Sequence, residues 1–128
     1  MDYELIDTLK QVLESKIEKT RSDIRHELHN KSYNDSLQNE IGTLEWVLEY
    51  IVQKKVHIGR LEVIVQDKIA ELKITMNKAT HREVTDFLFT KIETLRWVLY
   101  VIHSINKGCP AERRIVLEDS LPTRKFYD

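Results

Sequence analysis

The chain has 128 residues, with 20 basic and 21 acidic side chains and a formal net charge of −1. This length suits one domain with a modest core, and the balanced charge excludes a general electrostatic attraction to nucleic acid or anionic membranes. A content of 41% hydrophobic and 32% charged residues excludes a disordered chain, and only three glycines and two prolines favour long helices over many short strands.

The sequence carries no recognisable targeting segment. Its N-terminus, MDYELIDTLK, is acidic and amphipathic and lacks the basic and apolar regions of a signal peptide. No run of about 18 uncharged apolar residues is present, so we expect no membrane span. Cys109 is the only cysteine, which excludes an internal disulfide and fits a reducing compartment. We therefore expect a cytoplasmic protein.

The first two predicted helices form a hairpin. Apolar residues recur at steps of three and four from Tyr3 to about Asn30, which places them on one helical stripe. The polar run NKSYND, residues 30–35, predicts a loop, with Asn34 or Asp35 as the cap of the next helix. The second stripe then consists of Leu37, Ile41, Leu44, Leu48 and Ile51.

The third segment allows two interpretations. Its apolar residues at helical spacing are Leu61, Val65, Ile69, Leu72 and Met76. The stretch KVHIGRLEVIV, residues 55–65, also fits a β-hairpin with a turn at Gly59 and Arg60. We favour a helix, because the following residues continue the helical period without a break.

A fourth helix is predicted to follow Thr80, which has the spacing of a capping box with Glu83. Gly108, with a proline two residues later, is expected to end this helix. The remaining residues, 109–128, are expected to form a short C-terminal tail that is partly ordered or contains a short helix.

The second and fourth predicted helices carry nearly the same phrase, TLEWVLEYI at residues 43–51 and TLRWVLYVI at residues 94–102. The matched residues are Asp35, Leu37, Ile41, Thr43, Leu44, Trp46, Val47, Leu48 and Ile51 in the first copy, and Asp86, Leu88, Ile92, Thr94, Leu95, Trp97, Val98, Leu99 and Ile102 in the second. In the preceding helices, Leu13, Lys16, Ile17, Thr20 and Ile24 match Val65, Lys68, Ile69, Leu72 and Met76.

We infer that the chain is a duplicated helical hairpin, with copies at about residues 2–56 and 60–107. One hairpin cannot bury its apolar stripe alone, whereas two hairpins facing each other can. The predicted fold is therefore all-α, an antiparallel four-helix bundle of residues 1–108 built from two repeated αα-hairpins, with a short C-terminal tail.

Both tryptophans of the repeat are predicted to point away from the core. At about 100° per residue, Trp46 lies nearly opposite the stripe of its helix, and Trp97 does the same. Gly42, one turn before Trp46, costs about 1 kcal/mol relative to Ala, and close approach of another backbone or ring would explain this cost. Exposed aromatic residues mark partner surfaces. The predicted oligomer or partner interface consists of Gly42, Trp46, Tyr50, Phe89, Trp97, Tyr100 and Val101.

Two further interpretations of the aromatic residues stay open. The core stripe of each helix could be rotated from its predicted direction. Alternatively, the tail could cover the aromatic patch, because it contains the apolar run Ile115, Val116 and Leu117.

No catalytic or metal-binding pattern is found in the sequence. Asp23, His26 and His29 follow one another at one-turn spacing, yet the second copy has no matching ligands, so we interpret them as solvated helix residues. Cys109 follows a helix C-terminus, which is the unfavourable end of the helix dipole for a reactive thiolate. We therefore expect no enzyme activity, no metal and no cofactor.

The preferred function is a non-enzymatic interaction or regulatory protein, either a homodimer or bound to another protein, of the kind that bacteria and bacteriophages use as regulators or inhibitors. Neither a membrane nor a small-molecule substrate is expected. The alternative is a nucleic-acid-associated regulator, whose tail would contact phosphates. The basic residues of that tail are Arg113, Arg114, Arg124 and Lys125.

Overall fold

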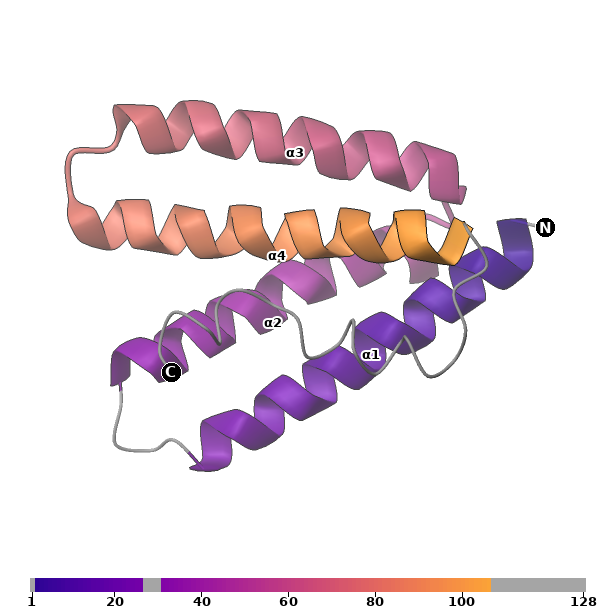
Figure 1. Cartoon of the computed structure of the whole chain (residues 1–128), viewed down its shortest axis with the longest axis horizontal. Coiled ribbons are helices and arrows are strands. Elements are labelled where there is room, and N and C mark those ends of the chain that lie inside the picture. The colour runs from indigo at the N-terminus through magenta and orange to yellow at the C-terminus, as the bar shows by residue number, and fades with distance from the viewer. Residues whose placement is uncertain (1, 27–30, 107–128) are drawn as a thin grey trace.

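The computed structural model describes residues 2–26 and 31–106, which form four helices (Figure 1). These are α1 (Asp2–His26), α2 (Lys31–Val52), α3 (Ile58–Lys78) and α4 (Arg82–Asn106). The predicted all-α antiparallel four-helix bundle is confirmed, and no strand occurs in this part of the chain. The predicted tail, residues 109–128, lies outside the described residues.

The bundle consists of two antiparallel hairpins. α1 pairs with α2 and α3 pairs with α4, and the contact between α2 and α4 is the most extensive one between the hairpins. Figure 1 shows that the hairpins cross at an angle, so their loop ends lie apart. α4 also contacts α1, and it therefore packs against all three other helices. None of the four helices combines the length and the apolar content needed to cross a bilayer.

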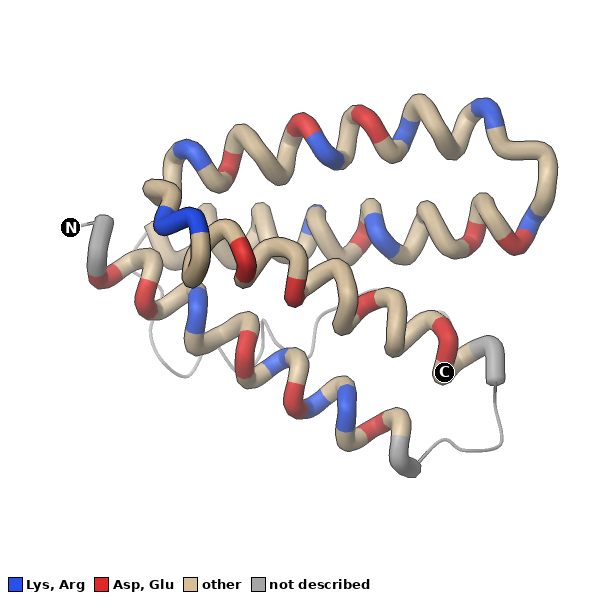
Figure 2. The backbone as a smooth tube through the Cα atoms, turned by 180° about the vertical axis from the view of Figure 1, so that it is seen from behind, with Lys and Arg blue, Asp and Glu red and all other residues tan. Residues whose placement is uncertain are grey.

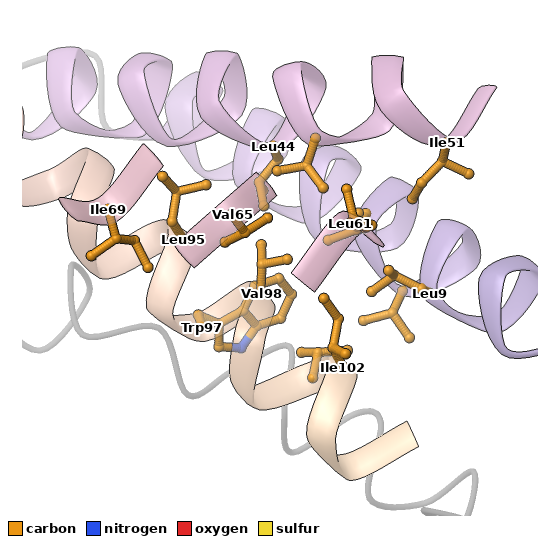
Figure 3. Close-up of a cluster of buried hydrophobic side chains, with 14 of the residues drawn as sticks. Leu9, Leu44, Ile51, Leu61, Val65, Ile69, Leu95, Trp97, Val98 and Ile102 are labelled. Atoms are coloured by element: carbon orange, nitrogen blue, oxygen red, sulfur yellow. The ribbon is translucent and has the colours of Figure 1, made fainter. Parts of the chain in front are cut away.

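All four helices contribute to one apolar core (Figure 3). The apolar side chains that are at most 1% exposed are Leu9 and Leu13 of α1, Leu37, Leu44 and Val47 of α2, Leu61 and Val65 of α3, and Leu95, Val98, Val101 and Ile102 of α4. Burying one such side chain contributes about 1.5–3 kcal/mol of transfer free energy. The core therefore joins the two hairpins into a single folding unit.

Two matched pairs of the inferred repeat have matched environments. Leu44 and Leu95 are both buried in the core. The buried hydroxyl groups of Thr43 and Thr94 each donate a hydrogen bond to the carbonyl oxygen four residues earlier, at 2.8 Å and 2.7 Å. Equal environments at these positions are what a duplicated hairpin predicts.

Two helix starts differ from their predictions. α2 begins at Lys31, so the predicted loop and the predicted cap at Asn34 or Asp35 are wrong. The run NKSYND contains no Gly or Pro to interrupt a helix, and short polar residues are well tolerated near a helix N-terminus. α4 begins at Arg82, and it is the carbonyl oxygen of His81, rather than Thr80, that accepts from the Thr85 N–H at 3.1 Å.

The ambiguous third segment is helical. α3 begins at Ile58, whose side chain is buried, and it continues through Leu61 and Val65 into the core. The prediction of a helix is therefore confirmed, and the β-hairpin alternative is wrong. Burial of every third or fourth side chain against α4 stabilises the helix here.

The predicted direction of Trp97 is wrong. Trp97 is only 4% exposed and Val101 is 0% exposed, and both belong to the core. Figure 3 shows Trp97 among the buried apolar side chains. The buried sectors of α2 and α4 are rotated toward Val47 and Val98, while Leu48, which was predicted to lie in the core stripe, is half-buried. Because α4 packs against three helices, its buried sector is wider than one stripe. Trp97 and Val101 therefore offer no exposed surface to a partner.

We expect Leu44→Ala and the matched substitution Leu95→Ala to lower the free energy of unfolding by similar amounts, about 2–5 kcal/mol each. Both side chains are fully packed at the centre of the core, so each truncation removes contacts and leaves a cavity. Chemical denaturation monitored by circular dichroism measures the change. Ile74→Ala is the control, because Ile74 is 58% exposed. A cost below about 1 kcal/mol at either leucine would contradict the single shared core.

Candidate functional site

The structure divides the predicted interface among three places. Gly42, Trp46 and Tyr50 lie along one exposed to half-buried stripe of α2. Phe89 and Tyr100 of α4 are 46% and 51% exposed. At about 100° per residue, these two share one side of α4, nearly opposite Phe87, which faces the groove described next. Trp97 and Val101, the remaining predicted residues, are part of the core. The single predicted surface is thus reduced to the stripe on α2.

A groove lies between the N-terminal halves of α2 and α4. Its lining residues are Asp35, Gln38, Asn39, Gly42, Phe87 and Lys91. The Asn39 side-chain amide donates a hydrogen bond to the Phe87 carbonyl oxygen at 2.8 Å and joins the two helices beneath the groove. A Cβ atom added to Gly42 would meet nothing within 4 Å. The close approach expected at Gly42 is therefore not made by any of the described residues, and the space above Gly42 is open to them.

The stripe continues from Gly42 to a pair of aromatic rings. The rings of Trp46 and Tyr50 meet edge to face, with centroids 5.0 Å apart and planes inclined by 72°. Lys68 of α3 places its ammonium 5.9 Å from the Trp46 ring centroid, and Lys54 lies 4.4 Å from that of Tyr50. Each cation interacts favourably with the negative face of its ring. Trp46 is half-buried and remains accessible at the surface.

Lys91 lies at the α4 side of the groove. Its ammonium is 5.0 Å from the Phe87 ring centroid, and no ion pair joins it to an acidic side chain among the described residues. Burial lowers the pKa of Lys91, and the positive charge of Lys68 lowers it further. Lys68 itself contacts Glu71 at 3.2 Å, an exposed pair along α3 that is worth little in stability. The cation that lines the groove is therefore Lys91.

A second polar cluster is enclosed between α1, α2 and α4. Lys16, Thr20 and Glu40 are each 0% exposed. The Thr20 hydroxyl donates to Oε1 of Glu40 at 3.0 Å, and the Lys16 ammonium lies 5.6 Å from the Trp97 ring centroid. Burial raises the pKa of the Glu40 carboxyl to about 7, although the Lys16 charge and the Thr20 hydrogen bond act in the opposite direction. This cluster is closed to solvent and serves the fold.

Sequence reasoning missed Lys16 and Glu40. The available signal was their spacing, since Lys16 falls between Leu13 and Thr20, and Glu40 between Leu37 and Leu44, at steps of three and four. Charged residues at core positions of a helix are buried only when they are paired. The sequence therefore allowed the prediction that Lys16 and Glu40, which have opposite charges and lie on neighbouring helices, are buried next to each other.

The remaining sequence candidates lie largely outside the described residues. These are His29 and Cys109, and the predicted nucleic-acid contacts Arg113, Arg114, Arg124 and Lys125. Among the described side chains, no group of three or more His, Cys, Asp or Glu residues is arranged to hold a metal ion. Figure 2 shows acidic and basic residues interspersed along the four helices, so this part of the chain gives no support to a nucleic-acid interface.

We expect the stability of the protein to fall with rising pH through the titration of Glu40. Its pKa is raised from 4.5 to about 7 on folding, so the folded protein keeps a proton that the unfolded chain loses. This contribution is fully present below about pH 4.5 and is lost as the pH rises through about 7. Glu40→Gln should remove it, and the stability of the variant relative to wild type should rise by about 3 kcal/mol across this window.

Urea denaturation at a series of pH values measures this difference. Glu14→Gln on the exposed side of α1 is the matched control, and its stability should follow the wild-type curve. Parallel curves for wild type and Glu40→Gln would contradict the raised pKa.

Comparison with known proteins adds no assignment to these residues. No protein-family model matches the chain, and no curated protein or solved structure is significantly similar to it. The candidate site is therefore assigned from its own geometry. Its principal features are the open groove at Gly42, the accessible Trp46 ring and the cation of Lys91.

Proposed function

We propose that this protein is a non-enzymatic helical interaction protein that forms a homodimer through the groove between α2 and α4. The proposal includes the aromatic stripe of α2, from Gly42 to Tyr50, in the same interface. The proposed function is that of a small regulator or inhibitor that acts by binding to a protein.

The observation that carries the proposal is the open space at Gly42. A glycine within a helix lowers stability by about 1 kcal/mol relative to alanine, and a Cβ atom added at Gly42 would meet nothing within 4 Å among the described residues. A second helix crossing α2 at this point could come close to its backbone. Trp46 one turn later offers the kind of large, half-buried ring that commonly anchors an interface.

The composition of this surface supports self-association about a two-fold axis. In such a dimer the same patch of both subunits meets, so the patch must be complementary to itself. The surface around the groove contains a small residue, aromatic rings, the cation of Lys91 and the acid of Asp35. Cations and acids of one copy can therefore meet their opposites in the other.

We expect Gly42→Leu to convert a wild-type dimer into a monomer while it stabilises the fold. Its Cβ atom meets nothing within 4 Å among the described residues, and leucine improves helix propensity by up to about 1 kcal/mol, yet the side chain fills the space that the second copy needs. Sedimentation across a concentration series measures the mass, and thermal unfolding below the dimer's dissociation constant measures the stability of the monomer. A wild-type chain that stays monomeric at every concentration would overturn the proposed homodimer.

Trp46→Ala should weaken the same dimer by at least about 30-fold in Kd, because truncating an interface tryptophan costs about 2 kcal/mol or more. Tyr100→Ala is the matched control, since Tyr100 is 51% exposed on the other side of α4. Sedimentation of both variants at one concentration gives the comparison. If the Trp46→Ala and Tyr100→Ala dimers dissociate equally, the interface does not include Trp46.

A further inference from the structure

A pocket of about 480 Å³ lies at the end of the bundle where α1 begins and α2 ends. Its apolar wall consists of Ile6 of α1, Ile51 and Val52 of α2, and Val56 of the connection to α3. Val52 is 49% exposed, and Ile6 and Val56 are half-buried. The groove at Gly42 lies in the other half of α2, so the proposed dimer does not use this pocket. An apolar wall that faces solvent favours an occupant that covers it.

Charged side chains of both signs surround the apolar wall. Lys10 of α1 is half-buried, and Lys55, which follows α2, is exposed. No ion pair joins either lysine to an acidic side chain among the described residues. Asp7 also lines the pocket, and its carboxylate accepts a hydrogen bond from the Gln11 amide at 3.1 Å. The pocket thus offers two cations and one acid beside an apolar wall.

The backbone at Lys55 indicates that this lysine serves more than the end of the helix. Lys55 has a φ angle of 49°, in the left-handed region, and the Val56 N–H donates to the Tyr50 carbonyl oxygen at 3.2 Å. Helices commonly end in this way, and glycine is the usual residue at such a position because a side chain is strained there. Lys54 already supplies a cation to the C-terminal end of α2. An acidic occupant of the pocket would explain a second lysine at a position that favours glycine.

The chain that follows α4 contains a segment with the matching chemistry. Residues 113–119 read RRIVLED, which places three aliphatic side chains between two cations and two acids. The aliphatic side chains would cover the apolar wall, and the acids would meet Lys10 and Lys55. An arginine of the segment would meet Asp7. Both signs of charge around the pocket therefore have an opposite in this one segment.

The topology brings the segment within reach of the pocket. Because the four helices alternate in direction, α4 ends at Asn106 at the same end of the bundle at which α1 begins and α2 ends (Figure 1). Neighbouring helix axes lie about 8–10 Å apart, so the path across this end of the bundle is about 20 Å. The linking residues, 107–114, can span about 26–29 Å when extended. The link is therefore long enough for Ile115 to reach the pocket.

We propose that residues 113–119 dock within the same chain into the pocket between α1 and α2 and cover its apolar wall. The contact is independent of the proposed homodimer, which uses the other half of α2. It gives the apolar run of Ile115, Val116 and Leu117 a place that neither the core nor the groove supplies.

Paramagnetic relaxation in the full chain tests this contact. A nitroxide is attached through Ser120→Cys in a Cys109→Ser background, which leaves one cysteine. The backbone amide signals of Val52 and Val56 should lose most of their intensity, because relaxation by the nitroxide falls steeply with distance. The signal of Met76, near the other end of the bundle, should keep its intensity. Equal intensities at the two ends would overturn the docked segment.

Charge reversal tests the chemistry of the contact. In the nitroxide-labelled chain, Lys10→Glu together with Lys55→Glu should restore the lost signals, because these residues then repel Glu118 and Asp119. Adding Glu118→Lys and Asp119→Lys should bring the loss back, which also shows that the reversed lysines leave the fold intact. Lys73→Glu, at an exposed lysine of α3, is the matched control and should change nothing. A loss of signal that survives reversal of the two lysines alone would overturn the proposed docking.

A mixed sample separates docking within one chain from docking between two. Nitroxide-labelled chain without isotope label is mixed with isotope-labelled chain that carries no nitroxide. The signals of Val52 and Val56 should keep their intensity in this mixture. A loss there would mean that the segment of a second copy occupies the pocket, and it would overturn the contact within one chain. Gly42→Leu, which removes only the proposed dimer, should leave the loss within one chain unchanged, so the two proposals fail separately.

Discussion

The contact between α2 and α4 is the constraint on which the rest of the structure depends. Each hairpin has an apolar stripe that it cannot bury alone, and the two stripes meet mainly through these helices. The hydrogen bond from Asn39 to the Phe87 carbonyl oxygen fixes the two helices to each other at one end of this contact. Because the hairpins cross at an angle, the same contact leaves a groove beside Gly42 instead of a closed seam.

Two halves with matching sequences consequently have different surroundings. α1 packs against α4, so Trp97 and Lys16 are buried. The carboxyl group of Glu40 lies close enough to Lys16 to interact with its charge. α3 covers α2 less completely, so Trp46 stays accessible. A buried lysine without a carboxylate would be strongly destabilising. Lys91 stands at the position that matches Glu40, and it is only half-buried. The lysine without a carboxylate partner among the described residues therefore lies in the half whose packing leaves it partly exposed to solvent.

The sequence predicted the four helices better than it predicted which of their side chains are buried. Spacing of apolar residues gives the direction of a helix's buried face, and it was sufficient for four helices, including α3. It does not give the number of neighbours, and α4 has three, which is why Trp97 is in the core. The groove at Gly42 depends on the crossing of the two hairpins, and only the three-dimensional arrangement shows it. Glu40 could have been recognised from its spacing alone.

The fold of the single chain does not explain the glycine at position 42, whereas an interface would. A glycine inside a folded chain is usually explained by a close neighbour or by a positive φ angle. Gly42 lies within α2, and among the described residues nothing comes within 4 Å of the position of its missing Cβ atom. Alanine there would make the same helix more stable by about 1 kcal/mol. The fold alone therefore gives no reason for glycine at this position. A second backbone that crosses α2 above the groove does give one, and it would bring its own side chains within reach of Trp46 and Lys91.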